Sequence, residues 1–322
     1  MPPEDAMPQD ATPGQSSVGL PIRPVQTFQG QGGRAAALAF SPDGRVLATG
    51  GGNTKVVLWD PYSARPLAEF SGHRGTGMFV VVRSLAFSPD GGLLASGGND
   101  KTVRVWRPST GECVNVLSGF SGAVTQVAFS PLARILAAAD ESTLLLFDVD
   151  SGAARRVALA EGDISSLAFS ADGSILAVAA GGKSRRGAHP VNLVDPASGQ
   201  VVRTLGDDGF SALSLAFSRD GRLLATAGRS KELQLWDTSR WEVVRSVGLR
   251  DTADVLAFSP QGLLGAATGG SVQLWDPATG SELAELKVPR LKNERDVAAL
   301  AFSPDGRLLA TSRFASFVRI YG

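Results

Sequence analysis

The sequence predicts an all-β protein built from seven copies of one four-stranded unit. Three observations lead to this prediction. The apolar runs are short and separated by Gly, Pro, Asp and Ser, no segment carries a sustained apolar stripe at the 3.6-residue period of a helix, and two aromatic landmarks alternate along the chain. Of the 322 residues, 38 are glycine, which suits a chain with many tight turns.

The unit is clearest between residues 72 and 107. This segment contains three runs of β-type composition, Val80–Phe87, Leu93–Ser96 and Thr102–Trp106. Ser-Pro-Asp-Gly separates the first two runs, and Gly-Gly-Asn-Asp-Lys separates the last two. Gly91 is expected to have a positive φ angle, which a residue with a side chain rarely adopts. Such a meander cannot bury both of its faces alone, and therefore predicts neighbours of the same kind.

The neighbours are marked by a repeated Ala-Phe-Ser and, later in each unit, by an aromatic or apolar residue that ends a strand. The Phe landmarks recur every 40 to 48 residues, at Phe40, Phe87, Phe129, Phe169, Phe217, Phe258 and Phe302. The second landmarks are Trp59, Trp106, Phe147, Val194, Trp236, Trp275 and Tyr321. A turn and a fourth strand follow each second landmark except the last, as in Pro66–Phe70, Cys113–Leu117, Val201–Leu205 and Glu242–Val247. Four antiparallel strands at this period are typical of a propeller blade.

The two ends of the propeller complete each other. The last unit stops at Gly322, after its third strand, whereas the segment from Pro24 to Gly30 is similar to the fourth strand of the first unit. We therefore expect the N-terminal strand to pair into the last blade and close a single seven-bladed ring over residues 23–322. Residues 1–22 are rich in Pro, Gln, Asp, Gly and Ser, and are expected to form a disordered tail.

The Ala-Phe-Ser-Pro-Asp-Gly turn and the Trp-Asp dipeptide, repeated at this period, resemble the WD-repeat (WD40) family over all but the N-terminal tail. The resemblance implies that a blade can be locked by a His, a Ser or Thr, an Asp and the Trp. The second blade matches this set residue by residue, with His73, Ser96, Asp100 and Trp106. Other blades are incomplete: Phe120 stands at the His position of the third blade and Glu141 at its Asp position. Phe120 is expected to replace the His by apolar packing.

Composition narrows the possible functions. The chain has 31 basic and 31 acidic side chains, so bulk charge does not support general binding of nucleic acid. The single cysteine, Cys113, excludes an intrachain disulfide and favours a reducing compartment. The N-terminus has no apolar signal segment, and no run is long enough to span a membrane. A cytoplasmic protein with no membrane partner is expected. Two His and one Cys, far apart in the repeat, predict neither a metal site nor a cofactor.

Three connections are longer than the repeat requires, around residues 75–81, 181–190 and 287–296. The resemblance places all three on one face of the propeller, conventionally the top, where insertions in repeat proteins often carry function. Arginine and aromatic residues there are typical of binding hot spots. The predicted partner-binding residues are Arg74, Met78, Phe79, Lys183, Arg185, Arg186, Phe210, Arg229, Arg290, Lys292, Arg313 and Phe314.

These patterns favour a non-catalytic scaffold that binds a protein or peptide on the top face, as a monomeric propeller or as a subunit of a larger hetero-complex. Two alternatives stay open. The Lys183–Arg186 cluster could bind nucleic acid or a phosphorylated ligand, although the mixed charge of the face argues against it. The second alternative is a propeller hydrolase. Only His73, Ser96 and Asp100 resemble a catalytic centre, and the family resemblance gives them a structural role.

Overall fold

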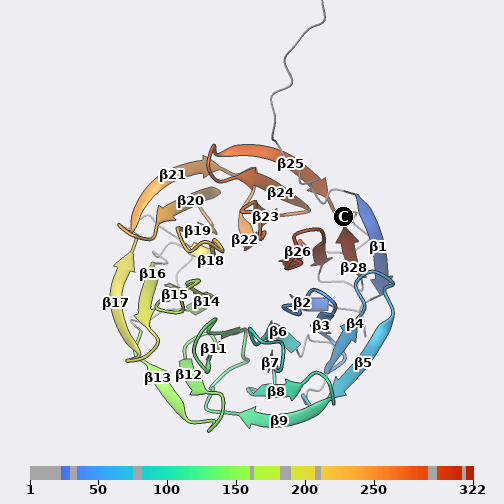
Figure 1. Cartoon of the computed structure of the whole chain (residues 1–322). Coiled ribbons are helices and arrows are strands. Elements are labelled where there is room, and N and C mark those ends of the chain that lie inside the picture. Colours follow the sequence, from blue (N-terminus) through green and yellow to red (C-terminus); the bar gives the residue numbers. More distant parts are fainter. Residues whose placement is uncertain are drawn as a thin grey trace, which may run out of the picture.

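The computed structural model describes residues 23–29, 35–74, 82–159, 163–181, 190–206, 212–288, 296–313 and 317–322. In this part of the chain, seven four-stranded antiparallel sheets are arranged as blades around a central channel (Figure 1). The predicted seven-bladed β-propeller is therefore confirmed. The expected disordered tail, residues 1–22, lies outside the described residues.

The strands follow one another outward from the channel in each of the first six blades, and the strands for which bounds were predicted lie within two residues of them. Blades one and two contain β2 (Ala35–Phe40), β3 (Leu47–Gly51), β4 (Lys55–Trp59), β5 (Pro66–Ser71), β6 (Val82–Phe87), β7 (Leu94–Gly98), β8 (Val103–Arg107) and β9 (Glu112–Leu117). Blades three and four contain β10 (Gln126–Phe129), β11 (Ile135–Ala139), β12 (Leu144–Asp148), β13 (Ala154–Val157), β14 (Asp163–Phe169), β15 (Leu176–Gly181), β16 (Val191–Asp195) and β17 (Gln200–Leu205). Blades five and six contain β18 (Ala212–Phe217), β19 (Leu223–Gly228), β20 (Glu232–Asp237), β21 (Glu242–Gly248), β22 (Ala253–Phe258), β23 (Leu264–Thr268), β24 (Ser271–Asp276) and β25 (Ser281–Lys287).

The seventh blade joins the two ends of the chain. It contains β26 (Val297–Phe302), β27 (Leu309–Arg313) and β28 (Phe317–Tyr321), and its outermost strand is β1 (Pro24–Gln29). β1 pairs with β28 in antiparallel register, with Phe28 opposite Val318. Phe28 is buried and its ring lies 4.5 Å from that of Trp59 in the first blade. The expected closure by the N-terminal strand is confirmed, and it removes a reactive sheet edge.

Burial is greatest at the second strand of each blade and least at the rim, and the sequence follows it. The second strand of each blade is covered on both faces by neighbouring blades, so these strands are buried and rich in Ala, Gly and Thr. At Gly97 an added Cβ would lie 2.8 Å from Val124 of the next blade, which leaves no room for a larger residue. The fourth strands form the rim and expose alternate side chains, as Val202 and Val244 do.

The hydrophobic core of the described residues is divided into seven clusters, one at each seam between neighbouring blades. The second landmark of every blade is buried in one of them. The seam between blades one and two, for example, packs Val56 and Phe70 against Trp106. Each blade is thus stabilised mainly by its two neighbours rather than by its own sheet.

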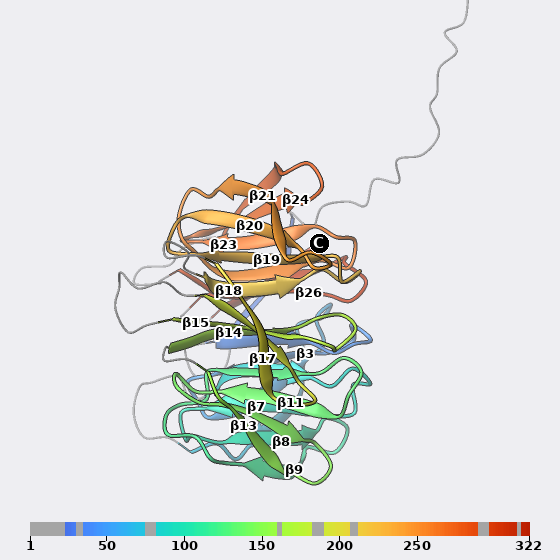
Figure 2. The same ribbon diagram turned by 90° about the vertical axis from the view of Figure 1, so that its left-hand side faces the viewer.

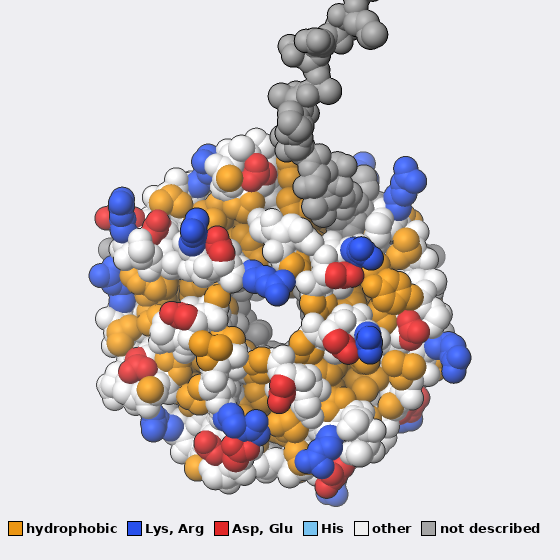
Figure 3. Space-filling model, in the orientation of Figure 1, with side chains coloured by type: hydrophobic (Ala, Val, Ile, Leu, Met, Phe, Trp, Pro, Cys, Tyr) orange, Lys and Arg blue, Asp and Glu red, His pale blue; other side chains and the backbone are white. Residues whose placement is uncertain are grey.

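Two faces result, and they differ in their loops (Figure 2). The lower face, seen in Figures 1 and 3, carries the turns between first and second strands and between third and fourth strands. Its Ser-x-Asp-Gly turns are closed by the side chains: in blade two Ser88 Oγ donates to Asp90 Oδ1, and Gly91 has a φ of 72°. The positive φ expected for Gly91 is confirmed. The upper face carries the loops between second and third strands and the connections to the next blade.

Candidate functional site

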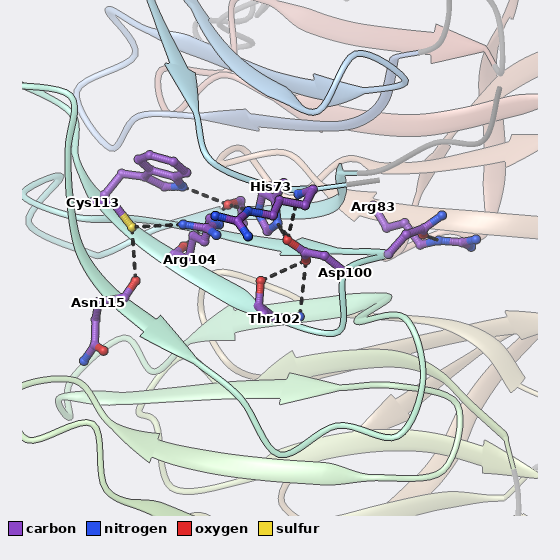
Figure 4. Close-up of polar contacts among 11 residues, drawn as sticks. His73, Arg83, Asp100, Thr102, Arg104, Cys113 and Asn115 are labelled. Atoms are coloured by element: carbon purple, nitrogen blue, oxygen red, sulfur yellow. Dashed lines mark hydrogen bonds and ion pairs between the residues drawn. The ribbon is translucent and has the colours of Figure 1, made fainter. Parts of the chain in front are cut away.

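A hydrogen-bonded chain of four side chains fixes the upper face of blade two (Figure 4). His73 lies in the connection before β6, and its Nδ1 is 3.0 Å from Asp100 Oδ1. Its Nε2 is 2.7 Å from the hydroxyl of Ser96 on β7, and Trp106 Nε1 on β8 donates to the same hydroxyl over 2.8 Å. With its proton on Nδ1, the His73 ring would donate to Asp100 and accept the Ser96 hydroxyl proton at Nε2.

This arrangement has the residue types of a serine hydrolase but cannot act as one. Ser96 is fully buried, and its oxygen accepts the Trp106 N–H, so no substrate can reach it. The chain ties the connection before β6 to the turn before β8, because Asp100 also accepts the backbone N–H of Arg74 over 3.0 Å. Its role in the fold is therefore structural.

The electrostatics of Asp100 are dominated by these contacts. Burial raises the pKa of this carboxyl, but hydrogen bonds from His73, the backbone N–H of Arg74 and the hydroxyl of Thr102 outweigh it and hold the pKa well below its usual range. Asp100 is consequently ionised at neutral pH, and it anchors the exposed Arg74 at the edge of the upper face.

Blade three also ties the connection before its first strand to the turn after its second strand, but with different residues. Phe120 replaces the histidine, is buried, and packs against Phe147 with ring centroids 6.1 Å apart. The acidic residue is Asp140, which accepts the backbone N–H groups of Ser121 and Gly122, each over 2.8 Å. The placement of Glu141 at this position is wrong, because Glu141 is exposed and its neighbour Asp140 makes the contacts. Phe120 is a core residue, as expected.

The mouth of the central channel brings charged residues from several blades together. A cavity of about 290 Å³ is lined by the first strands, including Arg83 on β6 and Asp254 on β22. Arg83 donates through Nε to the side chain of Asn99. Desolvation by burial raises the pKa of the Asp254 carboxyl. The nearby negative charge of Asp296 adds to this effect, and Arg229 opposes it. Neither Arg83 nor Asp254 was among the residues predicted from the sequence.

The structure places only part of the predicted partner-binding set. Arg74 and Arg229 are exposed on the upper face. Arg313, expected to be exposed on this face, is 2% exposed, and its guanidinium donates to the carbonyls of Gly270 and Val288 over 2.7 and 2.6 Å. That expectation is wrong: Arg313 joins blade seven to blade six. The others lie outside the described residues, namely Met78, Phe79, Lys183, Arg185, Arg186, Phe210, Arg290, Lys292 and Phe314.

The described part of the chain was searched for clusters of metal-ligand side chains and for membrane-spanning helices. No three His, Cys, Asp or Glu side chains within it come together as a metal ion requires. The described residues also include no helix of the length and apolarity that crossing a membrane needs. Cys113 is a free thiol within the second blade, 3.8 Å from the guanidinium of Arg104.

Comparison with known proteins finds one repeat family and several proteins similar to parts of this chain. The family model of the WD domain, G-beta repeat, matches residues 22–60, 64–107, 111–148, 199–237 and 286–321. Each matched segment ends with the third strand of a blade, and no match ends with the third strand of blade four or blade six. The small ribosomal subunit protein RACK1 of Schizosaccharomyces pombe is 30% identical over 105 residues, which are 31% of this chain and 33% of that protein. The Notchless protein homolog of Arabidopsis thaliana is 48% identical over 50 residues, 14% of this chain and 11% of the relative. The similarity thus spans about a third or less of each relative's length.

Proposed function

Because the chain belongs to the WD40 repeat family, we propose that it is a non-catalytic scaffold that binds a protein or peptide partner on its upper face. A cytoplasmic subunit of a larger complex is the form we favour. One of the relatives is named as a small ribosomal subunit protein, which supports assembly into a complex without identifying the partner.

One observation carries the proposal. At the channel mouth, desolvation by burial raises the pKa of the Asp254 carboxyl, the negative charges of Asp296 and Asp251 add to this effect, and Arg229 opposes it. A fold that needed only stability would gain from a neutral residue at this position. Sites where charge is held at a cost are often binding sites, because a partner's hydrogen-bond donors can satisfy the carboxylate.

The surrounding residues supply mixed charge rather than one sign. Lys231 pairs with Asp251 over 3.1 Å, and Arg229 lies exposed beside them. Alternating charges of this kind fit the polar rim of a protein interface better than a phosphate backbone. The sequence places seven further predicted anchors in the lengthened connections around residues 75–81, 181–190 and 287–296, and all seven lie outside the described residues.

The test is affinity purification from the native source with mass spectrometry. The variant that combines Phe79→Ala, Arg185→Glu and Arg186→Glu should lose the partner recovered with the wild-type chain. The matched control is Arg222→Glu with Arg307→Glu on the lower face, where both side chains are more than 80% exposed. Retention of the partner by the first variant, or equal loss in both, would exclude the upper face. In parallel, binding of a labelled oligonucleotide or phosphopeptide tests the alternative function of the Lys183–Arg186 cluster.

A further inference from the structure

On the lower face, the side chain at one position of the fourth strand connects neighbouring blades. In four blades this side chain is long and donates a hydrogen bond to a backbone carbonyl of the next blade, in the turn between its third and fourth strands. Gln26 donates to Tyr62 O over 2.9 Å, Arg203 to Arg240 O over 3.3 Å, Arg245 to Thr279 O over 2.9 Å, and Arg155 to Ala197 O. These residues are equivalent, because each lies opposite the residue before the second landmark.

Blades one, two and six depart from this pattern, with Asn115 at this position in blade two and Ala284 in blade six. In blade one the departure leaves an open groove. The equivalent residue is Ala68, which lies opposite Leu58 and has no side-chain donor. The turn that it faces contains Pro108 and Ser109, and Ala68 cannot reach the carbonyls there. A groove of about 640 Å³ opens at this seam, lined by Ala68, Pro108 and Ser109. At the seam between blades three and four, where Arg155 bridges, the corresponding space is about 280 Å³.

The groove between blades one and two has an apolar floor and an acidic rim. Its floor is formed by Val46, Leu58 and Phe87, and Leu67 on its edge is 52% exposed. The lower face as a whole shows hydrophobic side chains between charged ones (Figure 3). An exposed leucine beside an open apolar groove is an arrangement that folding alone does not require.

Among the residues that line this groove, only Asp43 and Asp90 carry a charge. Hydrogen bonds from Ser41 and from the backbone of Arg45 lower the pKa of Asp43, and those from Ser88 and from the backbone of Gly92 lower the pKa of Asp90. Both carboxylates belong to the adjacent Ser-Pro-Asp-Gly turns of blades one and two. They are therefore fixed in place and ionised on the rim of an apolar space.

We propose that the groove between blades one and two is a second docking surface, for an extended segment of a partner protein that carries an apolar side chain next to a lysine or arginine. The apolar side chain enters the space that Ala68 leaves open, against Leu58 and Phe87. The cation lies on the rim beside Asp43 or Asp90, which gives the segment its charge requirement. Because alternate side chains of an extended chain point to the same side, flanking residues contact Leu67 and Pro108.

This surface lies on the face opposite to the one in the proposed function, and the two can be tested separately. The probe is a displayed library of random twelve-residue peptides, selected on the full chain, followed by a fluorescein-labelled copy of the most enriched peptide. The decisive variant is Ala68→Arg, which restores the bridging side chain of Arg203 and Arg245 and fills the groove without removing any contact. Ala284→Arg is the matched control, since Ala284 holds the same register position in blade six.

We expect enriched peptides to share an apolar residue beside Lys or Arg. Their binding, measured by fluorescence anisotropy, should weaken at least tenfold on Ala68→Arg and stay within twofold on Ala284→Arg and on the upper-face variant. Replacement of the peptide's cation by Glu should weaken binding to a similar extent. Enrichment of acidic peptides, or equal binding to wild type and Ala68→Arg, overturns the proposal. So does a wild-type dimer that Ala68→Arg converts to a monomer, because the occupant is then a second copy of this chain.

Discussion

Blade six lacks one hydrogen bond that three other blades make, and a single substitution should restore it. In blades one, two and five the landmark Trp donates its indole N–H to a Thr or Ser on the second strand, over 2.8 to 3.1 Å. The equivalent residue in blade six is Ala266, two residues after Leu264, which lies opposite Trp275. Trp275 Nε1 is buried and, among the described residues, has no hydrogen-bond partner. We therefore predict that Ala266→Ser stabilises the protein.

The size of the effect follows from what changes. An unsatisfied buried donor costs about 1–3 kcal/mol, and one serine oxygen supplies the acceptor. Ala266 is fully buried, so the added atom also costs some packing energy. We expect a net gain of about 1 kcal/mol, which corresponds to a rise in melting temperature of about 2 °C for a chain of this size.

The assay is thermal unfolding at pH 7, with two controls. Thr226→Val removes the equivalent acceptor in blade five while it keeps the side-chain shape, and should lower the melting temperature by several degrees. In the Trp275→Phe background, Ala266→Ser should have no stabilising effect, because the donor is gone. A gain that persists in this background, or an unchanged melting temperature for Ala266→Ser beside a loss for Thr226→Val, would refute the reasoning.

Three further predictions concern closure, charge and the seam between blades six and seven. Deletion of residues 1–22 should leave the melting temperature nearly unchanged, whereas deletion of residues 1–29 removes β1 with Phe28 and should cost about 3 kcal/mol or more; equal melting temperatures would contradict the closure. Asp100→Asn should destabilise the protein at pH 7. Because the pKa of Asp100 is depressed in the folded state, its stabilising contribution is complete above the unfolded pKa of about 3.9 and is lost as the pH falls towards the folded value. In urea unfolding, the difference in stability between wild type and Asp100→Asn should therefore shrink below about pH 4 and stay constant between about pH 5 and 7. Arg313→Ala removes two buried hydrogen bonds from a charged group, to the carbonyls of Val288 and Gly270, of which Gly270 keeps only the backbone N–H of Val288 as donor. It should cost about 3 kcal/mol in the same assay, while normal stability with lost partner binding would show that Arg313 belongs to the interface.

The repeat made the fold predictable, and the same repeat limited what could be said of single residues. Seven coincident landmarks defined the blades, and the family resemblance then assigned His73, Ser96, Asp100 and Trp106 to one hydrogen-bonded chain. Arg313 was misplaced because its position before a loop indicates exposure, whereas its burial depends on two carbonyls of another blade. Contacts between blades have no counterpart in the sequence of one repeat.

Two other features were missed for reasons that can be corrected. Glu141 was preferred to Asp140 because the hairpin of blade three is one residue shorter than that of blade two. Counting back from Phe147 by the distance that separates Asp100 from Trp106 therefore ends at Glu141. Ala68 was overlooked although a signal was present. Alignment of the fourth strands shows Gln26, Arg203 and Arg245 at its position, and Ala68 faces a turn between third and fourth strands that no side chain reaches. Ala284 is different, because the blade that it faces has β1 as its fourth strand and therefore no such turn.

The pairing of β1 with β28 also sets the order in which the molecule can fold. The residues that meet there are separated by almost the whole chain, so the last sheet cannot form until residue 321 has been synthesised. Until then β1 carries unpaired backbone groups, and the seam between blades seven and one cannot assemble. Closure of a loop this long is slow compared with the pairing of neighbouring strands within one blade. We therefore expect the ring to close as the last step of folding, and an open-ring intermediate with an exposed strand edge to be the state most prone to aggregate during synthesis.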